Sequence, residues 1–243
     1  MAHTIGTYRA HLVTLKRTLT RESDLMHAIQ RFVTPQTDTM LMHLSELIDR
    51  SRMHSVDYAT IDDQYRRYCT EELKPFTNRL RTIRDRVHKA VKSIETAHHE
   101  LSADFAHLSP KLPRALGEAH KRAGEDLSIV SKDERFVEKV EREEERMLRR
   151  MEQLIDGFIL RDIARAERHH RPDDTPLDSD IKALQETSRK VQGFSNLICE
   201  KARLARVHLD DAIDDIGQEI EGVEKIVELT QHKDPFLQSK RAA

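Results

Sequence analysis

The sequence predicts an all-α protein, an elongated antiparallel bundle of three long, kinked helices. Charged residues make up 35% and apolar residues 37% of the 243 residues, a balance typical of long helices with solvent-exposed faces. Gly and Pro, at seven residues each, are too few for a chain rich in turns. Apolar residues also recur every three or four positions over long stretches, which is the helical period.

The longest periodic stretch runs from residue 73 to residue 108. Its apolar residues include a series that repeats every seven positions without a break, as in helices that pack along one seam. These seam residues are Leu73, Leu80, Val87, Ile94, Leu101 and Leu108. The helical pattern begins near Val56, which predicts a helix of about 50 residues and roughly 75 Å. A compact chain of this size is only about 45 Å across. We therefore expect an elongated dimer in which two copies bury each other's seam.

The elements before the central helix contain two prolines with different expected effects. Residues 4–33 follow a helical period. Thr34-Pro35 then predicts an N-cap and the first position of a new helix, so the first segment should be kinked. Pro75 lies inside the central helical pattern. Its missing N–H group and its ring should bend the helix there.

The elements after the central helix are separated by breaks. Pro110 and Pro113 end the central helix, and a short helical piece follows. Ser131 is the predicted N-cap of the next helix, which ends near Arg171. The polar connector 172–180 precedes the last helix, which we expect to run to about residue 230.

Composition limits the classes of partner and the location. The formal net charge of −2 gives no overall field toward nucleic acid or lipid, and we expect no nucleic-acid partner. Two cysteines are too few for a disulfide framework and suit a reducing compartment. No apolar run reaches the 18 residues of a membrane span, and no secretory signal is recognised. We expect a cytoplasmic protein with one helical domain, residues 1–231, and a disordered tail, residues 232–243.

The first 21 residues contain four basic residues and no acid. A mitochondrial presequence or a membrane-inserting amphipathic helix has this composition. The apolar positions, however, continue in register through Met26, Ile29 and Val33, which favours a core helix.

Two sequence patterns resemble metal sites, and both have a simpler explanation: an exposed acidic face for the first and chance for the second. Asp210-Asp211-x-x-Asp214-Asp215 matches one aspartate-rich box of helical prenyl-transferring enzymes. The second box is missing, so the seven acids between residues 207 and 224 favour an exposed acidic face. Glu95-x-x-His98 and Glu167-x-x-His170 have the spacing of a di-iron bundle, which also needs two further inward glutamates.

No catalytic residue, metal ligand or cofactor is predicted, and we do not expect an enzyme. Cys69 and Cys199 lie in helical patterns, where buried structural thiols are commoner than activated ones. A metal-dependent helical enzyme is retained as a minor hypothesis.

Basic residues form three clusters, and the densest lies in the central helix. Between residues 79 and 92 there are six Lys or Arg residues and one acid, a local charge of +5. The second cluster follows Pro110, and the third comprises Arg161, Arg165, Arg168 and Arg171. Basic residues near an anionic leaflet contribute about 1 kcal/mol each. Alternatively, these side chains pair with acids on neighbouring helices. The candidate lipid-binding residues are Arg79, Arg81, Arg84, Arg86, Lys89, Lys92, Lys111, Arg114, Lys121 and Arg122.

Taken together, these features resemble a BAR domain, and the chain is most similar to the Chibby-interacting BAR family. The similar segments are Asp24-Leu25-Met26, Thr34-Pro35-Gln36-Thr37, Glu71-Glu72-Leu73-Lys74-Pro75-Phe76, Arg84-Asp85-Arg86 with Lys89 and Lys92, and Phe194-Ser195-Asn196-Leu197. The similarity covers residues 10–215, with a longer tip at 107–131 and the connector 172–180 as departures. It implies homodimerisation, binding of curved membranes, a Chibby-type coiled-coil partner and a place near centrioles and the base of cilia. Some relatives are linked with mitochondria.

The sequence therefore predicts a non-enzymatic, BAR-like homodimer that binds and shapes anionic phospholipid membranes. The alternative is a cytoskeletal or axonemal helical scaffold, in which the basic clusters bind acidic protein segments such as tubulin tails.

Overall fold

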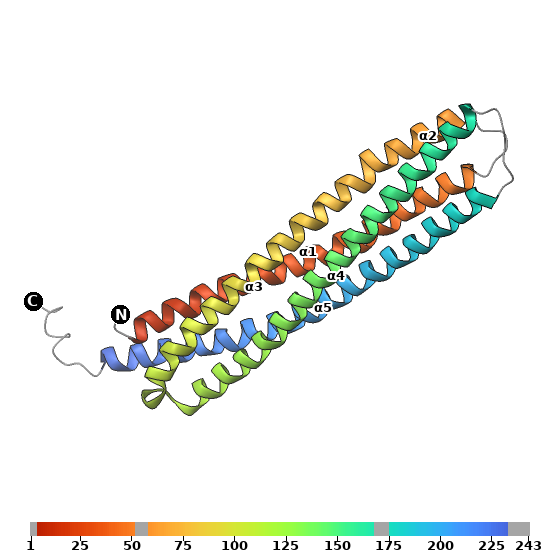
Figure 1. The fold of residues 1–243 in the computed structure, drawn as a ribbon. Helices are drawn as coiled ribbons and strands as arrows, with labels where there is room; N and C mark the ends of the chain where they lie inside the picture. The colour runs from red at the N-terminus through yellow and green to blue at the C-terminus, as the bar shows by residue number, and fades with distance from the viewer. Residues whose placement is uncertain (1–3, 52–57, 168–174, 233–243) are drawn as a thin grey trace, which may run out of the picture. The chain divides into compact units, whose positions relative to one another are not determined.

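The structure is a computed structural model that describes residues 4–51, 58–167 and 175–232. Nearly all of these residues are helical and none forms a strand, which confirms the all-α class. The helices, in chain order, are α1 (Ile5–Ser51), α2 (Tyr58–Arg67), the π-helix η1 (Tyr68–Leu73), α3 (Lys74–Leu108), the 3-10 helix η2 (Ser109–Lys111), α4 (Arg114–Glu167) and α5 (Thr175–His232) (Figure 1).

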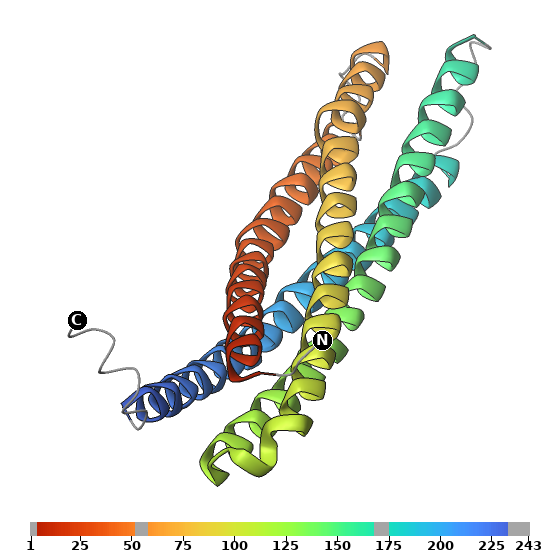
Figure 2. The ribbon, with the colours of Figure 1, turned by 90° about the vertical axis from the view of Figure 1, so that its left-hand side faces the viewer.

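Contacts between helices divide the chain into two compact units. Unit 1 comprises residues 1–27, 87–135 and 203–243, and unit 2 comprises residues 28–86 and 136–202. The four long helices α1, α3, α4 and α5 each contribute one segment to unit 1 and another segment to unit 2. Within unit 1, the start of α1, the end of α5 and the α3–α4 connection lie toward the same end (Figures 1 and 2).

Each unit has an apolar core to which all four long helices contribute. The unit 1 core includes Tyr8, Leu12, Leu15, Leu19, Val87, Ile94, Leu101, Leu127, Val130, Leu209, Ile216 and Val223. The unit 2 core includes Ile29, Val33, Met40, Leu44, Tyr65, Leu73, Leu80, Val137, Leu148, Met151, Ile155, Ile181, Leu184 and Val191. The buried positions on each helix recur at three- and four-residue steps, so the helical period of the sequence identifies the core.

The number of long helices differs from the prediction of three. The segment before the central helix is itself a long helix, α1, and its buried residues continue from Tyr8 to Ile48. In unit 2, α1 packs with α3, α4 and α5 as a fourth member of the core.

The expected break at Thr34-Pro35 is wrong, because α1 runs through both residues. The Thr34 hydroxyl donates to Cys199 Sγ at 2.9 Å and does not cap a helix. An internal proline costs about 3 kcal/mol. Burial of Val33 and Met40 on either side outweighs that cost, since a break would remove an apolar face from the core.

Pro75 lies in the first turn of α3, directly after the π-helix η1. The Lys74 N–H donates to the Cys69 carbonyl, five residues back, which is the wider π-helical pattern. A proline ring clashes with the carbonyl four residues before it. The π-turn is therefore the local adjustment found where the sequence predicted a bend.

α4 is continuous where the sequence predicted a short piece followed by a new helix at Ser131. Two glycines lowered the expectation of a helix, and one of them has a packing role. A Cβ on Gly124 would lie 3.2 Å from His98, a tight contact, so this glycine allows α3 to approach α4 closely. A Cβ on Gly117 would lie 3.6 Å from Phe105, an ordinary van der Waals distance. Leu127 and Val130 are buried, so the buried face of α4 is continuous up to Ser131.

α5 begins at Thr175, so residues 175–180 of the expected connector are helical. Pro176 follows Thr175 directly. The first turn of a helix accepts proline because its N–H groups have no intrahelical acceptor there. Residues 168–171 at the predicted end of the preceding helix, residues 172–174 of the connector and residues 233–243 of the expected tail lie outside the described residues.

The predicted seam is buried within the single chain. All six seam residues, from Leu73 to Leu108, are at most 5% exposed. They are core residues of units 1 and 2 and offer no apolar stripe to a second copy in this structure. Homodimerisation through other surfaces stays a prediction.

The N-terminal part of α1 is a core helix, as its register predicted. Tyr8, Leu12, Leu15 and Leu19 are all fully buried in unit 1. Among the described residues, no helix has a long enough apolar stretch to cross a bilayer.

Candidate functional site

The basic residues of the 79–92 cluster in α3 differ in the side chains that they contact. Arg81 and Arg84 contact Glu145 of α4, within unit 2. Arg81 Nη2 lies 2.7 Å from Glu145 Oε1, and Arg84 Nη1 lies 2.6 Å from Oε2. Arg149, one turn along α4, places a third guanidinium 2.6 Å from Oε1. These two arginines of α3 are thus engaged in holding α3 against α4.

Glu145 is ionised although its side chain is only 8% exposed. Burial by itself raises the pKa of a carboxyl. The hydrogen bonds from Arg81, Arg84 and Arg149 outweigh burial here and lower the pKa of Glu145 to about 2. Arg81 and Arg84 are therefore ion-paired with Glu145 inside unit 2.

Arg79 has an aromatic partner. Its guanidinium carbon lies 3.9 Å from the centre of the Phe32 ring, a cation–π contact between α3 and α1 in unit 2. Phe32 also packs against Phe76, with ring centroids 5.9 Å apart. Arg79 is exposed, but its guanidinium group stays in contact with the Phe32 ring.

The remaining basic residues of the 79–92 cluster are Arg86 in unit 2 and Lys89 and Lys92 in unit 1, and all three are exposed. We call them the α3 basic group. None of the three forms an ion pair with a described residue of the chain. The one acid between residues 79 and 92, Asp85, has its carboxylate 3.8 Å from Arg84. The α3 basic group is therefore the part of the predicted cluster that has no acidic partner among the described residues.

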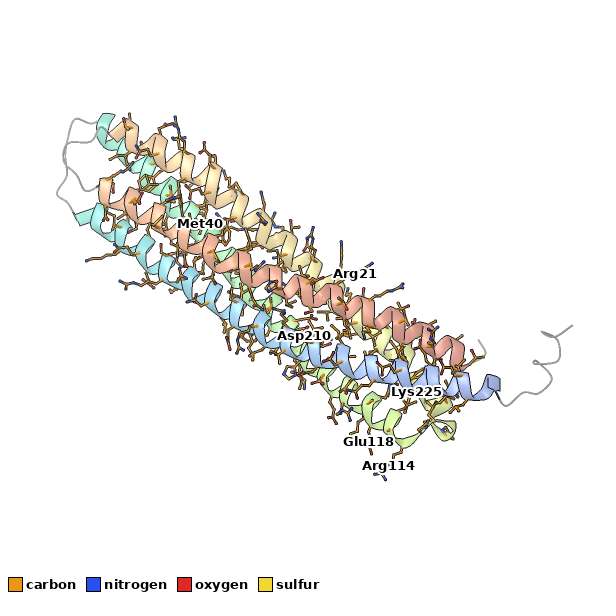
Figure 3. All side chains as sticks on the ribbon, turned by 180° about the vertical axis from the view of Figure 1, so that it is seen from behind. Arg21, Met40, Arg114, Glu118, Asp210 and Lys225 are labelled. Carbon is orange, nitrogen blue, oxygen red and sulfur yellow. The ribbon has the colours of Figure 1, made fainter. Side chains whose placement is uncertain are left out.

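The candidate lipid-binding residues at the start of α4 all have acidic partners. These residues are Arg114, Lys121 and Arg122. Arg114, with a 94% exposed side chain, lies 3.1 Å from Glu118 in the same helix (Figure 3). Lys121 lies 3.6 Å from Glu125. Such exposed pairs contribute little and leave the cation accessible. Arg122 is bound in unit 1 by Asp215 of α5, with Nη2 2.8 Å from Oδ1.

Some predicted basic residues cannot be assigned a role from the structure. The side chains of Lys111 and of the third cluster, Arg161 to Arg171, lie outside the described residues.

The aspartate-rich box is divided among different partners in unit 1. Asp210 accepts a hydrogen bond from the Ser23 hydroxyl at 2.7 Å, and Asp215 binds Arg122. A diphosphate–magnesium site needs these carboxylates to converge, and they do not.

Of the di-iron spacing, the structure describes only the first pair, Glu95 and His98, and these two have separate partners. Glu95 is paired with Arg135, whereas the ring of His98 is stacked near that of His120. The side chains of Glu167 and His170 lie outside the described residues.

Cys69 has the surroundings of a structural thiol. Burial, with smaller contributions from Asp156 and Glu152, raises the pKa of Cys69 to about 12. A thiol with such a pKa is not an activated nucleophile at neutral pH.

The structure also contains a buried polar network in unit 1 that sequence reasoning did not find. Tyr8 of α1 donates a hydrogen bond to Glu219 of α5, which is fully buried. His120 Nδ1 of α4 lies 3.2 Å from Glu219 Oε1. The Phe105 ring of α3 stacks on His120, with centroids 4.1 Å apart and planes at 8°. Four helices thus meet at one network.

Burial dominates the electrostatics of this network. It lowers the pKa of His120 to about 4 and raises that of Glu219 to about 8. The sequence interpretation of residues 207–224 as an exposed acidic face is therefore wrong for Glu219. The sequence did contain a signal for the burial of Glu219, because this residue lies at an apolar seam position, one turn after Ile216 and one turn before Val223.

Four further glutamates lie in the cores. In unit 1, burial raises the pKa of Glu22 to about 7 and that of Glu134 to about 9. In unit 2, burial raises the pKa of Glu144 to about 8 and places that of Glu141 well above its usual value. We call these four residues and Glu219 the buried glutamate group. Burial favours the protonated form of these carboxyls, because ionisation is costly in a poorly solvated position.

An open cavity of about 230 Å³ lies beside the π-helix in unit 2. Its lining carries both charges, including His43, Arg50, Arg67 and Glu72. His43 Nδ1 lies 2.8 Å from Glu72 Oε2, so part of the lining is already paired. This mixture favours no single class of small molecule.

Comparisons of the chain with models of protein families, with curated proteins and with solved structures found no match.

Proposed function

We propose that this protein is a non-enzymatic, peripheral membrane protein that binds anionic phospholipid through α3. The observation that carries this proposal is the exposure of the α3 basic group, Arg86, Lys89 and Lys92, without acidic partners among the described residues. Arg114 and Lys121 at the start of α4 supplement it, because their exposed intrahelical pairs are weak.

The expected energies indicate that one copy binds weakly. Each basic residue near an anionic leaflet contributes about 1 kcal/mol, so the three residues contribute about 3 kcal/mol. Two linked copies double this term and add avidity. We therefore propose that the protein acts as a BAR-like homodimer, in which form it shapes the membrane that it binds.

The surface proposed for a second copy is not the buried seam. In unit 2, the exposed apolar side chains of Phe136 (37% exposed) and Leu197 (36% exposed) lie on α4 and α5. Lys201 Nζ lies 5.3 Å from the centre of the Phe136 ring. Burial of these side chains against a second chain would supply the apolar contact that the seam does not.

Liposome co-sedimentation tests lipid binding. We expect the full chain to sediment with phosphatidylserine vesicles at low salt, to be released as salt is raised, and not to sediment with neutral vesicles. Triple reversal of the α3 basic group to Glu should abolish binding. The matched control reverses three exposed basic residues of α4, Lys132, Lys139 and Arg150, with the same change in net charge, and should retain it.

Arg81 and Arg84 are unsuitable for this test. Reversal of either would place an acid beside the buried Glu145 and unfold the site. Equal loss of binding in the α3 variant and the α4 control would overturn the proposal. Electron microscopy of the same vesicles tests shaping, with tubules expected only for the binding variants.

The sedimentation experiments also test the scaffold alternative. Sedimentation with microtubules but not with anionic vesicles would replace the membrane proposal by the scaffold. A Chibby-type partner and a place at the base of cilia are proposed from the family resemblance alone.

A further inference from the structure

Three side chains with metal-ligating atoms meet between α4 and α5 in unit 1. Asp126 of α4 and His208 and Asp211 of α5 each present one donor atom, and the three atoms lie within 4.8 Å of one another. His208 Nδ1 is 3.1 Å from Asp126 Oδ1. The side chains of His208 and Asp126 are 29% and 21% exposed, and Asp211 is exposed, so an ion can reach them.

Helix geometry accounts for this meeting. His208 and Asp211 are three residues apart, so they lie one turn from each other on the same face of α5. That face is turned toward Asp126, across the α4–α5 contact. The neighbouring Asp210, labelled in Figure 3, points to a different partner, the Ser23 hydroxyl of α1.

The local charge favours a cation. The α5 segment from 207 to 224 contains seven acids and no Lys or Arg. Among the described residues, no Lys or Arg forms an ion pair with Asp126 or Asp211, and the nearby Arg122 binds Asp215. Two carboxylates therefore converge on an imidazole, and the nearest arginine, Arg122, forms its ion pair with Asp215 and interacts with Asp126 only at longer range.

We propose that Asp126, His208 and Asp211 bind one divalent transition-metal ion of the zinc class. One imidazole nitrogen and two carboxylate oxygens form a ligand set used by Zn²⁺ and its neighbours in the first transition row. Three protein donors are too few for Ca²⁺, which takes six to eight oxygens. The absence of thiolate in the set disfavours Cu(I).

Metal binding requires only local adjustment of this group. The 3.1 Å separation of His208 Nδ1 and Asp126 Oδ1 already suits two ligands of one ion with bonds of about 2.0–2.2 Å, and rotation of the carboxylates would bring all three donors to it. The bound ion then joins α4 to α5 and leaves a fourth position for water. The proposed metal site shares no residue with the α3 basic group. A negative result in the metal experiment therefore leaves the lipid-binding proposal unaffected, and the reverse also holds.

Calorimetric titration of the chelator-treated full chain with Zn²⁺ and with Mg²⁺ tests this proposal. We expect one Zn²⁺ per chain and no stoichiometric Mg²⁺. A rise in melting temperature of about 5 °C is expected at a free Zn²⁺ concentration about 100 times the dissociation constant. Co²⁺ substitution should give visible absorption bands from a nitrogen–oxygen ligand set.

Single variants decide whether these residues are the ligands. His208→Gln and Asp126→Asn should each weaken Zn²⁺ binding at least about tenfold. The matched controls His99→Gln and Asp214→Asn alter exposed residues of unit 1 outside the group and should bind as the unmodified chain does. Circular dichroism of the metal-free variants establishes that each is folded.

Two results overturn the proposal. One is the absence of stoichiometric Zn²⁺ binding at a metal concentration about tenfold above that of the protein. The other is equal binding by His208→Gln, Asp126→Asn and the two controls, which would assign the ion to adventitious surface sites.

Discussion

The carboxylate of Glu145 shows how a single residue decides the role of its neighbours. Three arginines surround it, and two of them belong to the densest basic cluster of the sequence. Removal of one partner from a buried ion pair is more harmful than loss of an exposed pair, because the remaining charge stays in a poorly solvated position. Arg84, with a side chain only 20% exposed, would be left in that position.

We expect Glu145→Ala to reduce the free energy of unfolding by about 3 kcal/mol. The matched control is Glu143→Ala on the same helix. Glu143 pairs with Arg146, whose side chain is 69% exposed, so its loss should cost less than about 1 kcal/mol. Urea denaturation of both variants measures the difference. Equal losses would contradict an internal role for Glu145.

At the scale of the helix, the glycines of α5 distinguish packing from intrinsic preference. A Cβ on Gly222 would lie 2.4 Å from Leu116 Cδ2, at the α4–α5 contact of unit 1. A Cβ on Gly193 would meet no atom within 4 Å. Helix propensity favours alanine equally at both positions, so any difference between them comes from packing.

The substitutions Gly193→Ala and Gly222→Ala should therefore have opposite effects. We expect Gly193→Ala to stabilise the protein by about 0.5–1 kcal/mol, through helix propensity and a less flexible unfolded chain. Gly222→Ala should destabilise it by about 1–2 kcal/mol, since overpacking exceeds that gain. Thermal unfolding measures both. Stabilisation by both substitutions would show that Leu116 moves away freely.

At the scale of the molecule, the buried glutamate group links stability to pH. The folded-state pKa values of its five members all lie above the ordinary pKa of a glutamate carboxyl. A group with a raised folded pKa contributes stability below its unfolded pKa and loses it as pH rises toward the folded value. His120 acts in the opposite direction, because its lowered pKa costs stability as pH falls from 6.5 to about 4.

We expect the free energy of unfolding to be greatest near pH 5 and to fall between pH 5 and pH 8. The slope is about 1.4 kcal/mol per pH unit for each glutamate that stays protonated in the folded chain. Glu144→Gln replaces a neutral carboxyl by a neutral amide and should flatten the slope. Urea titrations at pH 5, 6, 7 and 8 measure it. Stability that rises over this range would show that the buried carboxyls are ionised and partnered.

Particular residues show how far the sequence could predict this protein. The period of apolar residues predicted the all-α class and the core positions, including Leu80, Val87 and Ile94. It did not reveal that these residues are covered by the same chain. Periodicity identifies which face of a helix is buried, whereas the identity of the covering helix depends on distant segments.

The continuity of the helices was the less predictable part. Pro35, Gly117, Gly124 and Ser131 are local signals for a break, and each lies inside a helix. Tertiary packing overrides such signals when a break would expose core residues on both sides.

The sequence by itself determined that the chain is helical, where its apolar faces lie and where basic residues concentrate. Only the tertiary structure decided which basic residues remain available and which acids are buried. It ties Arg81 and Arg84 to Glu145, leaves Arg86, Lys89 and Lys92 exposed, and brings Asp126 to His208. The physical reason is that helical periodicity is a property of neighbouring residues, whereas ion pairing and burial depend on which helices meet.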